Sequence, residues 1–160
     1  MIRFEKQIVI GSDHAAFNLR QTIKSLLIEH GYTVEDVGSH RETSADYPDY
    51  GISVASMIST DQFKKGILIC GTGIGMSMVA NRFPHVRAAL CNDLFSAIMS
   101  RQHNDANILV MGGSIIGDIL AWEIVATWLE TPFEGGRHQQ RLDKFDHVDP
   151  TVPFRTLLKP

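Results

Sequence analysis

Short apolar runs alternate with longer amphipathic stretches along almost the whole chain. The runs are mostly continuous in apolar residues, which is typical of strands buried on both faces, and they lie at 7–11, 33–37, 66–70, 87–91 and 107–111. Between them, apolar residues recur at helical spacing and predict helices over 15–30, 48–59, 94–102 and 117–129, with a short helix ending near 81. Strands that alternate with helices predict a three-layer α/β/α fold, a doubly wound, Rossmann-like five-stranded parallel sheet.

The ends of the helices and of the domain carry their own signals. Gly31 suits the position just after a helix, and Asp93 can cap the helix that follows it. Beyond 132 the chain turns polar and reads Glu-Gly-Gly-Arg-His-Gln-Gln-Arg over 134–141. A chain of 160 residues fits one domain. We therefore expect a single domain over 1–145 with a C-terminal helical extension, and a tail without motifs over 146–160.

Composition and charge narrow the classes of partner. The formal net charge of -3 creates no general attraction for nucleic acid or an anionic membrane, so an anionic ligand must meet a local basic cluster. No apolar segment approaches the roughly 18 residues of a membrane span, and the first residues lack the pattern of a secretory signal. The two cysteines show no disulfide spacing. We expect a cytoplasmic protein without a nucleic-acid or membrane partner.

Chemically capable residues follow the predicted strands. Asp13 and His14 come after the first strand, and Cys70 and Thr72 come at the end of the third. In open parallel sheets, ligands bind beyond the carboxyl ends of the strands. We therefore expect the active site at this edge.

A glycine-rich turn, Gly71-Thr72-Gly73-Ile74-Gly75, follows Cys70 directly. Met76 stands where a dinucleotide fingerprint needs glycine or alanine and where a cysteine phosphatase needs arginine, and no P-loop Gly-Lys-Ser/Thr follows. What remains is a turn whose backbone N–H groups converge at a helix start, where they can hold a phosphate or a developing oxyanion, or serve only tight packing. Such surroundings favour the thiolate of Cys70. Cys91 has no such neighbours and is interpreted as a core thiol.

Two further groups stand out nearer the C-terminus. His103 lies within Ser100-Arg101-Gln102-His103-Asn104-Asp105, and no His or Cys spacing in the chain supports a metal site. Arg137 and Arg141 are four residues apart, so a helix would place both on one face. Two guanidinium groups there can clamp a phosphate, although the same pattern is common at solvated helix ends.

Taken together, these segments resemble the type B ribose-5-phosphate isomerases of the ribose/galactose isomerase family. The matching segments are spread from the first strand to the C-terminal helix and cover the domain to about residue 145; they are Gly11-Ser12-Asp13-His14, Asp46-Tyr47-Pro48, 70–75, 100–105 and 134–141. The resemblance implies interconversion of ribose 5-phosphate and ribulose 5-phosphate through a cis-enediol, with no metal and no cofactor.

The resemblance also assigns roles to the reacting groups. Cys70 would move the proton between C1 and C2, and His103 would open the furanose ring, aided by Asp13 or Thr72. The backbone N–H groups that would stabilise the carbonyl oxygen belong to Gly71, Thr72, Gly73, Ile74 and Gly75.

The remaining assignments concern binding. His14, Arg137 and Arg141 would hold the phosphate, while Asp13, Tyr47 and Asn104 would line the sugar. The resemblance further implies a homodimer, and allows a tetramer, in which the partner subunit contributes the segment around His103 and both arginines to each site.

The sequence departs from the family pattern at one position, and this leaves the identity of the substrate undecided. Many family members carry arginine shortly after the fifth strand, where this chain has Ser114. Ser114 cannot supply that cation, so isomerisation of a hexose 6-phosphate such as allose or galactose 6-phosphate remains an alternative. A non-catalytic sugar-phosphate binding domain on the same scaffold is the other.

Overall fold

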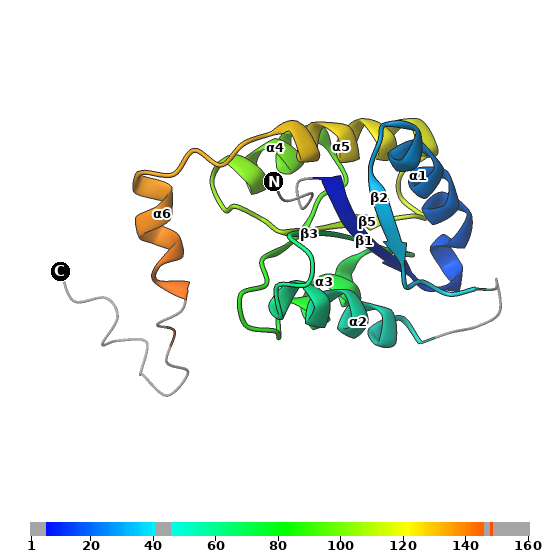
Figure 1. The fold of residues 1–160 in the computed structure, drawn as a ribbon, viewed down its shortest axis with the longest axis horizontal. Helices are drawn as coiled ribbons and strands as arrows, with labels where there is room; N and C mark the ends of the chain where they lie inside the picture. Colours follow the sequence, from blue (N-terminus) through cyan, green and yellow to red (C-terminus); the bar gives the residue numbers. More distant parts are fainter. Residues whose placement is uncertain (1–5, 41–45, 146–147, 149–160) are drawn as a thin grey trace.

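A five-stranded parallel sheet forms the centre of the computed structural model, which describes residues 6–40, 46–145 and 148. The strands lie in the order β2-β1-β3-β5-β4 (Figure 1). Their bounds are β1 (Gln7–Ser12), β2 (Thr33–Asp36), β3 (Lys65–Cys70), β4 (Ala88–Leu90) and β5 (Ile108–Gly112). The chain adds β2 on one side of β1 and β3 on the other, so the strand order reverses between β1 and β3, where ligands bind in such sheets.

Helices cover both faces of the sheet. The helices α1 (Phe17–Glu29), α4 (Leu94–Gln102) and α5 (Asp118–Glu130) pack on one face, and α2 (Tyr47–Ser59) and α3 (Ile74–Ala80) on the other (Figure 1). Alternate residues of β3 supply the two cores: Ile67 and Ile69 face α1 and α5, whereas Leu68 and Cys70 face α2 and α3. The prediction of a doubly wound, three-layer fold is confirmed.

The predicted helix boundaries hold with one instructive difference. Gly31 has a φ of +82° after α1, and Asp93 Oδ1 accepts a hydrogen bond of 2.7 Å from the N–H of Ser96 at the start of α4. The first helix, predicted from 15, begins instead with a 3₁₀ turn, η2 (His14–Ala16). Ala16 then departs from helical geometry with φ -117° and ψ 20°, so the turn stands apart from α1 and keeps His14 at the edge of the sheet.

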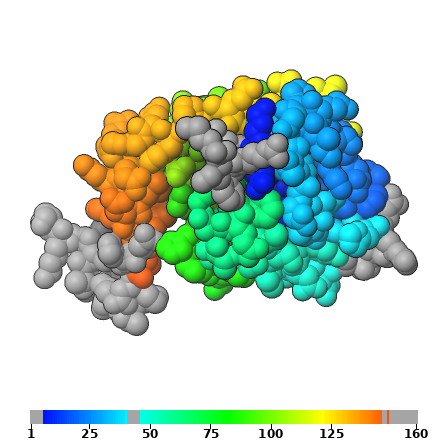
Figure 2. All heavy atoms as spheres, in the orientation of Figure 1, coloured from blue at the N-terminus to red at the C-terminus, as the bar shows by residue number. Residues whose placement is uncertain are grey.

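The C-terminal extension is the helix α6 (Arg137–Leu142), which stands to the side of the sheet after an extended segment (Figure 1). Figure 2 shows it as a separate lobe beside the body. Arg137 and Arg141 both lie on it and are exposed, as their spacing predicts, while His138 and Leu142 are buried. The predicted tail over 146–160 lies outside the described residues except for Val148.

Candidate active site

Asp13 and Cys70 meet at the carboxyl edge of the sheet. The register pairs Ser12 of β1 with Ile69 of β3, so Asp13 and Cys70 occupy the next positions on adjacent strands. Neighbouring strands lie about 4.8 Å apart, which brings these side chains into one site. His14 follows on η2, and Thr72 lies in the turn after β3. The structure therefore brings together the four residues that the sequence placed at strand ends.

The glycine-rich turn aims a backbone donor at the cysteine. The N–H of Gly73 donates to Cys70 Sγ at 3.1 Å, and the N–H of Ile74 donates to Thr72 Oγ1 at 3.3 Å. Gly73 has a φ of +80°, and a Cβ there would lie 2.4 Å from Leu90 Cδ1. Only glycine fits this position. The first N–H groups of α3 have no acceptor within the helix, so they face the edge beside the sulfur.

Tyr47 covers the far end of the same turn. It opens α2, is 41% exposed, and packs its ring so closely on Gly75 that a Cβ there would lie 2.6 Å from the ring carbons. The close approach requires glycine at 75. Tyr47 thus forms a wall of the site above the backbone donors.

Asp13 is buried, with 7% of its surface exposed, and its Oδ1 has no hydrogen-bond partner among the described residues. Burial raises the pKa of Asp13, while the nearby charge of His14 and the N–H groups of Ala15 and Ala16 act in the opposite direction. Buried acceptors are nearly always satisfied in folded proteins. This oxygen is therefore a candidate acceptor for a ligand hydroxyl.

We expect Asp13→Asn to raise thermal stability at pH 7. The folded protein holds the Asp13 proton more tightly than the unfolded chain, so ionisation of this buried carboxyl above the unfolded value of 3.8 destabilises the fold. The amide avoids that cost, and each kcal/mol relieved is worth about 2–4 °C in Tm. Thermal unfolding of both proteins from pH 3 to pH 8 measures this. The gap should close toward low pH; a variant that is less stable at pH 7 would contradict the burial argument.

Sequence reasoning missed Arg20, which fixes the end of β1. Its side chain is 1% exposed; Nη1 donates to Ser12 Oγ at 2.8 Å, Nη2 donates to the carbonyl of Ser39 at 2.5 Å, and Nε lies 3.2 Å from Asp36 Oδ1. These contacts tie the strand end before Asp13 to the segment after β2. The signal was available, because Arg20 precedes the apolar residues Ile23 and Leu27 by helical spacing and so falls on the buried face of α1.

The other predicted site residues lie at the opposite edge. His103 and Asn104 follow the C-terminus of α4, close to Asn107, whose carbonyl accepts from the N–H of Gly66 at the amino end of β3. A strand of five residues spans about 17 Å. Within one chain, His103 and Asn104, together with Arg137 and Arg141 of the neighbouring α6, are therefore separated from Cys70 by the length of the sheet.

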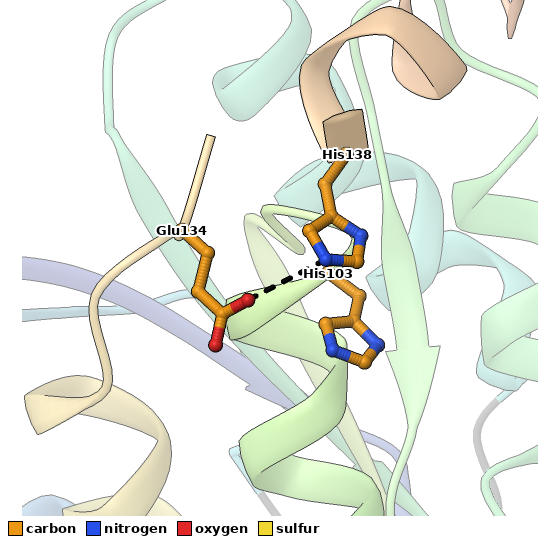
Figure 3. A group of neighbouring side chains, drawn as sticks. All are labelled: His103, Glu134 and His138. Atoms are coloured by element: carbon orange, nitrogen blue, oxygen red, sulfur yellow. Dashed lines mark ion pairs between the residues drawn. The ribbon is translucent and has the colours of Figure 1, made fainter. Parts of the chain in front are cut away.

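His103 stacks on His138 of α6, with ring centroids 4.1 Å apart and planes 8° from parallel (Figure 3). Glu134 Oε2 lies 3.4 Å from His138 Nε2, and the potential ligand atoms of these three residues lie within 4.8 Å of one another. A metal ion must lie close to the plane of each imidazole that binds it. Two parallel stacked planes share no such point, so one ring would have to rotate before both could bind one ion.

Cys91 is buried in the core, as expected. It is 1% exposed, and burial raises the pKa of its thiol, so it is a core residue with little thiolate at neutral pH. Ser114 lies at the active edge, where its N–H donates to the carbonyl of Gly71 at 2.9 Å.

A cavity of about 600 Å³ separates α6 from the body and is lined by residues of 81–89, 104–106 and 139–148. It includes Asn104 but none of the residues around Cys70. The cavity is thus a space between α6 and the body of the protein, apart from the candidate site at the carboxyl edge of the sheet.

Comparison with known proteins agrees with this arrangement of strands and helices. The family model described as Ribose/Galactose Isomerase matches residues 8–145. The chain belongs to this family. The resemblance inferred from the sequence motifs is thereby confirmed.

Individual members of the family are similar over nearly their full lengths. Ribose-5-phosphate isomerase B of Escherichia coli is 43% identical over 90% of this chain and 97% of its own. D-erythrulose-4-phosphate isomerase of Pectobacterium atrosepticum is 40% identical over 89% and 94%. The solved structure of a ribose 5-phosphate isomerase from Thermotoga maritima has a TM-score of 0.86 at 51% identity, covering 89% of this chain and 98% of that one. Among the described residues, no helix has the length and apolar character to cross a membrane.

Proposed function

We propose that this protein interconverts ribose 5-phosphate and ribulose 5-phosphate. The observation that carries the proposal is the Cys70 thiol, which lies at the strand switch point and accepts a backbone N–H from Gly73. On the adjacent strand β1, the register places Asp13 at the corresponding position, and its Oδ1 has no hydrogen-bond partner among the described residues. A base, an anion-stabilising backbone and a hydroxyl acceptor are the groups that proton transfer next to a carbonyl requires. Family membership supports the same reaction class.

In the isomerisation step, the Cys70 thiolate removes the proton from C2 of the open-chain aldose. The electron pair forms the C1–C2 double bond, and negative charge develops on O1, where the N–H groups of the turn from Gly71 to Gly75 stabilise it. O1 takes up the proton that O2 gives up, and Cys70 returns its proton to C1. C2 thereby becomes the carbonyl carbon and C1 ends as a CH2OH group. No net oxidation occurs, and the proposal assigns no metal or cofactor to any step.

Ring opening must come first, because C2–H becomes acidic only beside a free carbonyl. His103 acts as acid and base here: the proton leaves the C1 hydroxyl, the C1–O4 bond breaks, and O4 takes a proton. Asp13 and Thr72 assist at the sugar hydroxyls. At the other end of the substrate, a phosphate would meet His14 and the exposed guanidinium groups of α6, Arg137 and Arg141. Tyr47 and Asn104 line the sugar between.

A homodimer with shared sites is part of the same proposal. It is supported by the separation of the two residue groups at opposite edges of one chain, since a second chain can supply the missing half. Exposed apolar side chains beside Cys70 offer a surface for such a partner; they are Tyr47 and Ile52 of α2 and Ile74 and Met78 of α3, the last of them 65% exposed. A tetramer would be built from such dimers.

Two further proposals concern the bounds of the domain and the cellular location of the protein. We place the end of the domain near residue 145, where the family match ends. We place the protein in the cytoplasm, where its two free cysteines would stay reduced.

A side-by-side assay decides the sugar. We expect turnover of ribose 5-phosphate at a higher kcat/KM than that of allose 6-phosphate, galactose 6-phosphate or erythrose 4-phosphate. The tetrose is included because one relative is named for erythrulose 4-phosphate. A higher kcat/KM for a hexose phosphate would change the assigned substrate but not the proposed mechanism. Binding of an aldose phosphate without turnover of any of them would favour the non-catalytic alternative. Ser114→Arg in the same assay tests whether the absent cation affects KM.

A further inference from the structure

His138 is the buried polar residue of α6, a helix whose other buried residue is Leu142. It is 4% exposed, while its neighbours Arg137 and Gln139 are exposed. Burying an imidazole costs free energy unless its polar atoms find partners, so a buried histidine is expected to make specific contacts. Its face lies against the ring of His103, and its Nε2 lies near Glu134. The three residues of Figure 3 therefore come from three places in the chain: the position just after α4, the extended segment, and α6.

His103 needs such support because its own helix provides little. It is the residue just after α4, and its ring is only partly buried. The parallel contact with His138 fixes the plane of the His103 ring. Because stacking uses the faces of the rings, both nitrogens of His103 stay at the ring edge, where they can exchange protons.

Contacts of Glu134 and Arg137 hold the two stacked histidines in place. The N–H of Glu134 donates to the carbonyl of Gln102 at 3.1 Å, which ties the extended segment to the residue before His103. Glu134 Oε2 and Arg137 Nε each lie 3.4 Å from His138 Nε2. Burial lowers the pKa of His138, and the charges of His103 and Arg137 lower it further, which favours the neutral imidazole in the stack.

We propose that His138 is a positioning residue that orients the His103 ring for opening of the furanose. This inference rests on the proposed function, in which His103 opens the ring. It assigns the parallel stack of His138 on His103 to one chemical step, and it leaves proton transfer by Cys70 independent of His138.

A pair of substrates isolates that step. Ribose 5-phosphate closes through O4, whereas its 4-deoxy analogue has no O4 and has O5 esterified, so it stays open-chain. We expect His138→Ala to lower kcat/KM for ribose 5-phosphate by about 10–100-fold, the size of effect that misplacing a catalytic group produces, and to change it little for the analogue. Equal losses on both substrates, or no loss on either, would overturn the proposal.

Two matched variants separate positioning from folding. His138→Phe keeps a flat ring and should restore most of the rate on ribose 5-phosphate. His30→Ala removes another imidazole from an aromatic contact, with Trp122 at 4.6 Å, and should leave the ratio of the two substrates unchanged. A phenylalanine variant as impaired as the alanine variant would contradict the stacking role.

A measurement made without substrate tests the positioning role of His138 independently of the proposed function. The stacked ring should shift the His103 ring protons upfield in NMR spectra of the wild type, and His138→Ala should remove that shift. Unchanged His103 signals would overturn the positioning role even in an active enzyme. A wild type that does not turn over ribose 5-phosphate would instead overturn the proposed function.

Discussion

Cys70→Ala is expected to lower kcat for ribose 5-phosphate by about 10²–10⁴-fold, the usual contribution of a general base. In the proposed mechanism Cys70, the last residue of β3, carries the proton between C1 and C2. Alanine leaves the N–H of Gly73 without its acceptor but removes no backbone contact. Initial rates with saturating substrate measure the loss. KM should change much less, because the phosphate and sugar ligands stay in place.

Cys91→Ala is the matched control for the loss of a thiol. Cys91 is equally buried but lies in the core on the other face of the sheet, with Ala97 and Leu109. It should retain nearly the wild-type kcat and lose some thermal stability through the small cavity created. A Cys70→Ala variant that keeps full rate, or a Cys91→Ala variant that loses it, would show that another group is the base.

Mixing two inactive variants should restore activity if the site is shared between subunits. In a mixed dimer of Cys70→Ala and His103→Ala, one site receives both mutant residues and the other receives neither. Random pairing makes half of the dimers mixed, each with one restored site of two, so co-expressed subunits should show about a quarter of wild-type activity. Differently tagged subunits, purified together, allow the specific activity of the mixed dimer to be measured directly.

The control for this experiment pairs two residues from the same edge. Cys70→Ala mixed with Asp13→Ala cannot rebuild a site, because one subunit supplies both residues to each site, and activity should stay at background. Restoration by this pair would contradict the proposed division. Failure of the Cys70 and His103 pair to complement, in dimers shown to be mixed, would place the whole site within one chain or assign His103 no role.

Much of the fold was readable from the sequence because it depends on local pattern. Continuous apolar runs such as that of β3 arise when both faces of a strand are covered, and the alternation with helices leaves few parallel arrangements. Asp93 and Gly31 marked helix ends through their own side-chain and backbone chemistry. The break at Ala16 was missed, since a 3₁₀ turn and the first turn of an α-helix have the same apolar spacing over so few residues.

Part of the candidate site could likewise be predicted from the sequence, and part could not. The sequence by itself determined the strand-end group, because residues after parallel strands must share one edge: Asp13, Cys70 and the glycine turn followed from chain order alone. Only the tertiary structure decided that Arg20 anchors this edge, that Tyr47 lies on Gly75, and that His138 stacks on His103. These are contacts between segments far apart in the chain, which local spacing does not encode. The packing of helices on the sheet creates them.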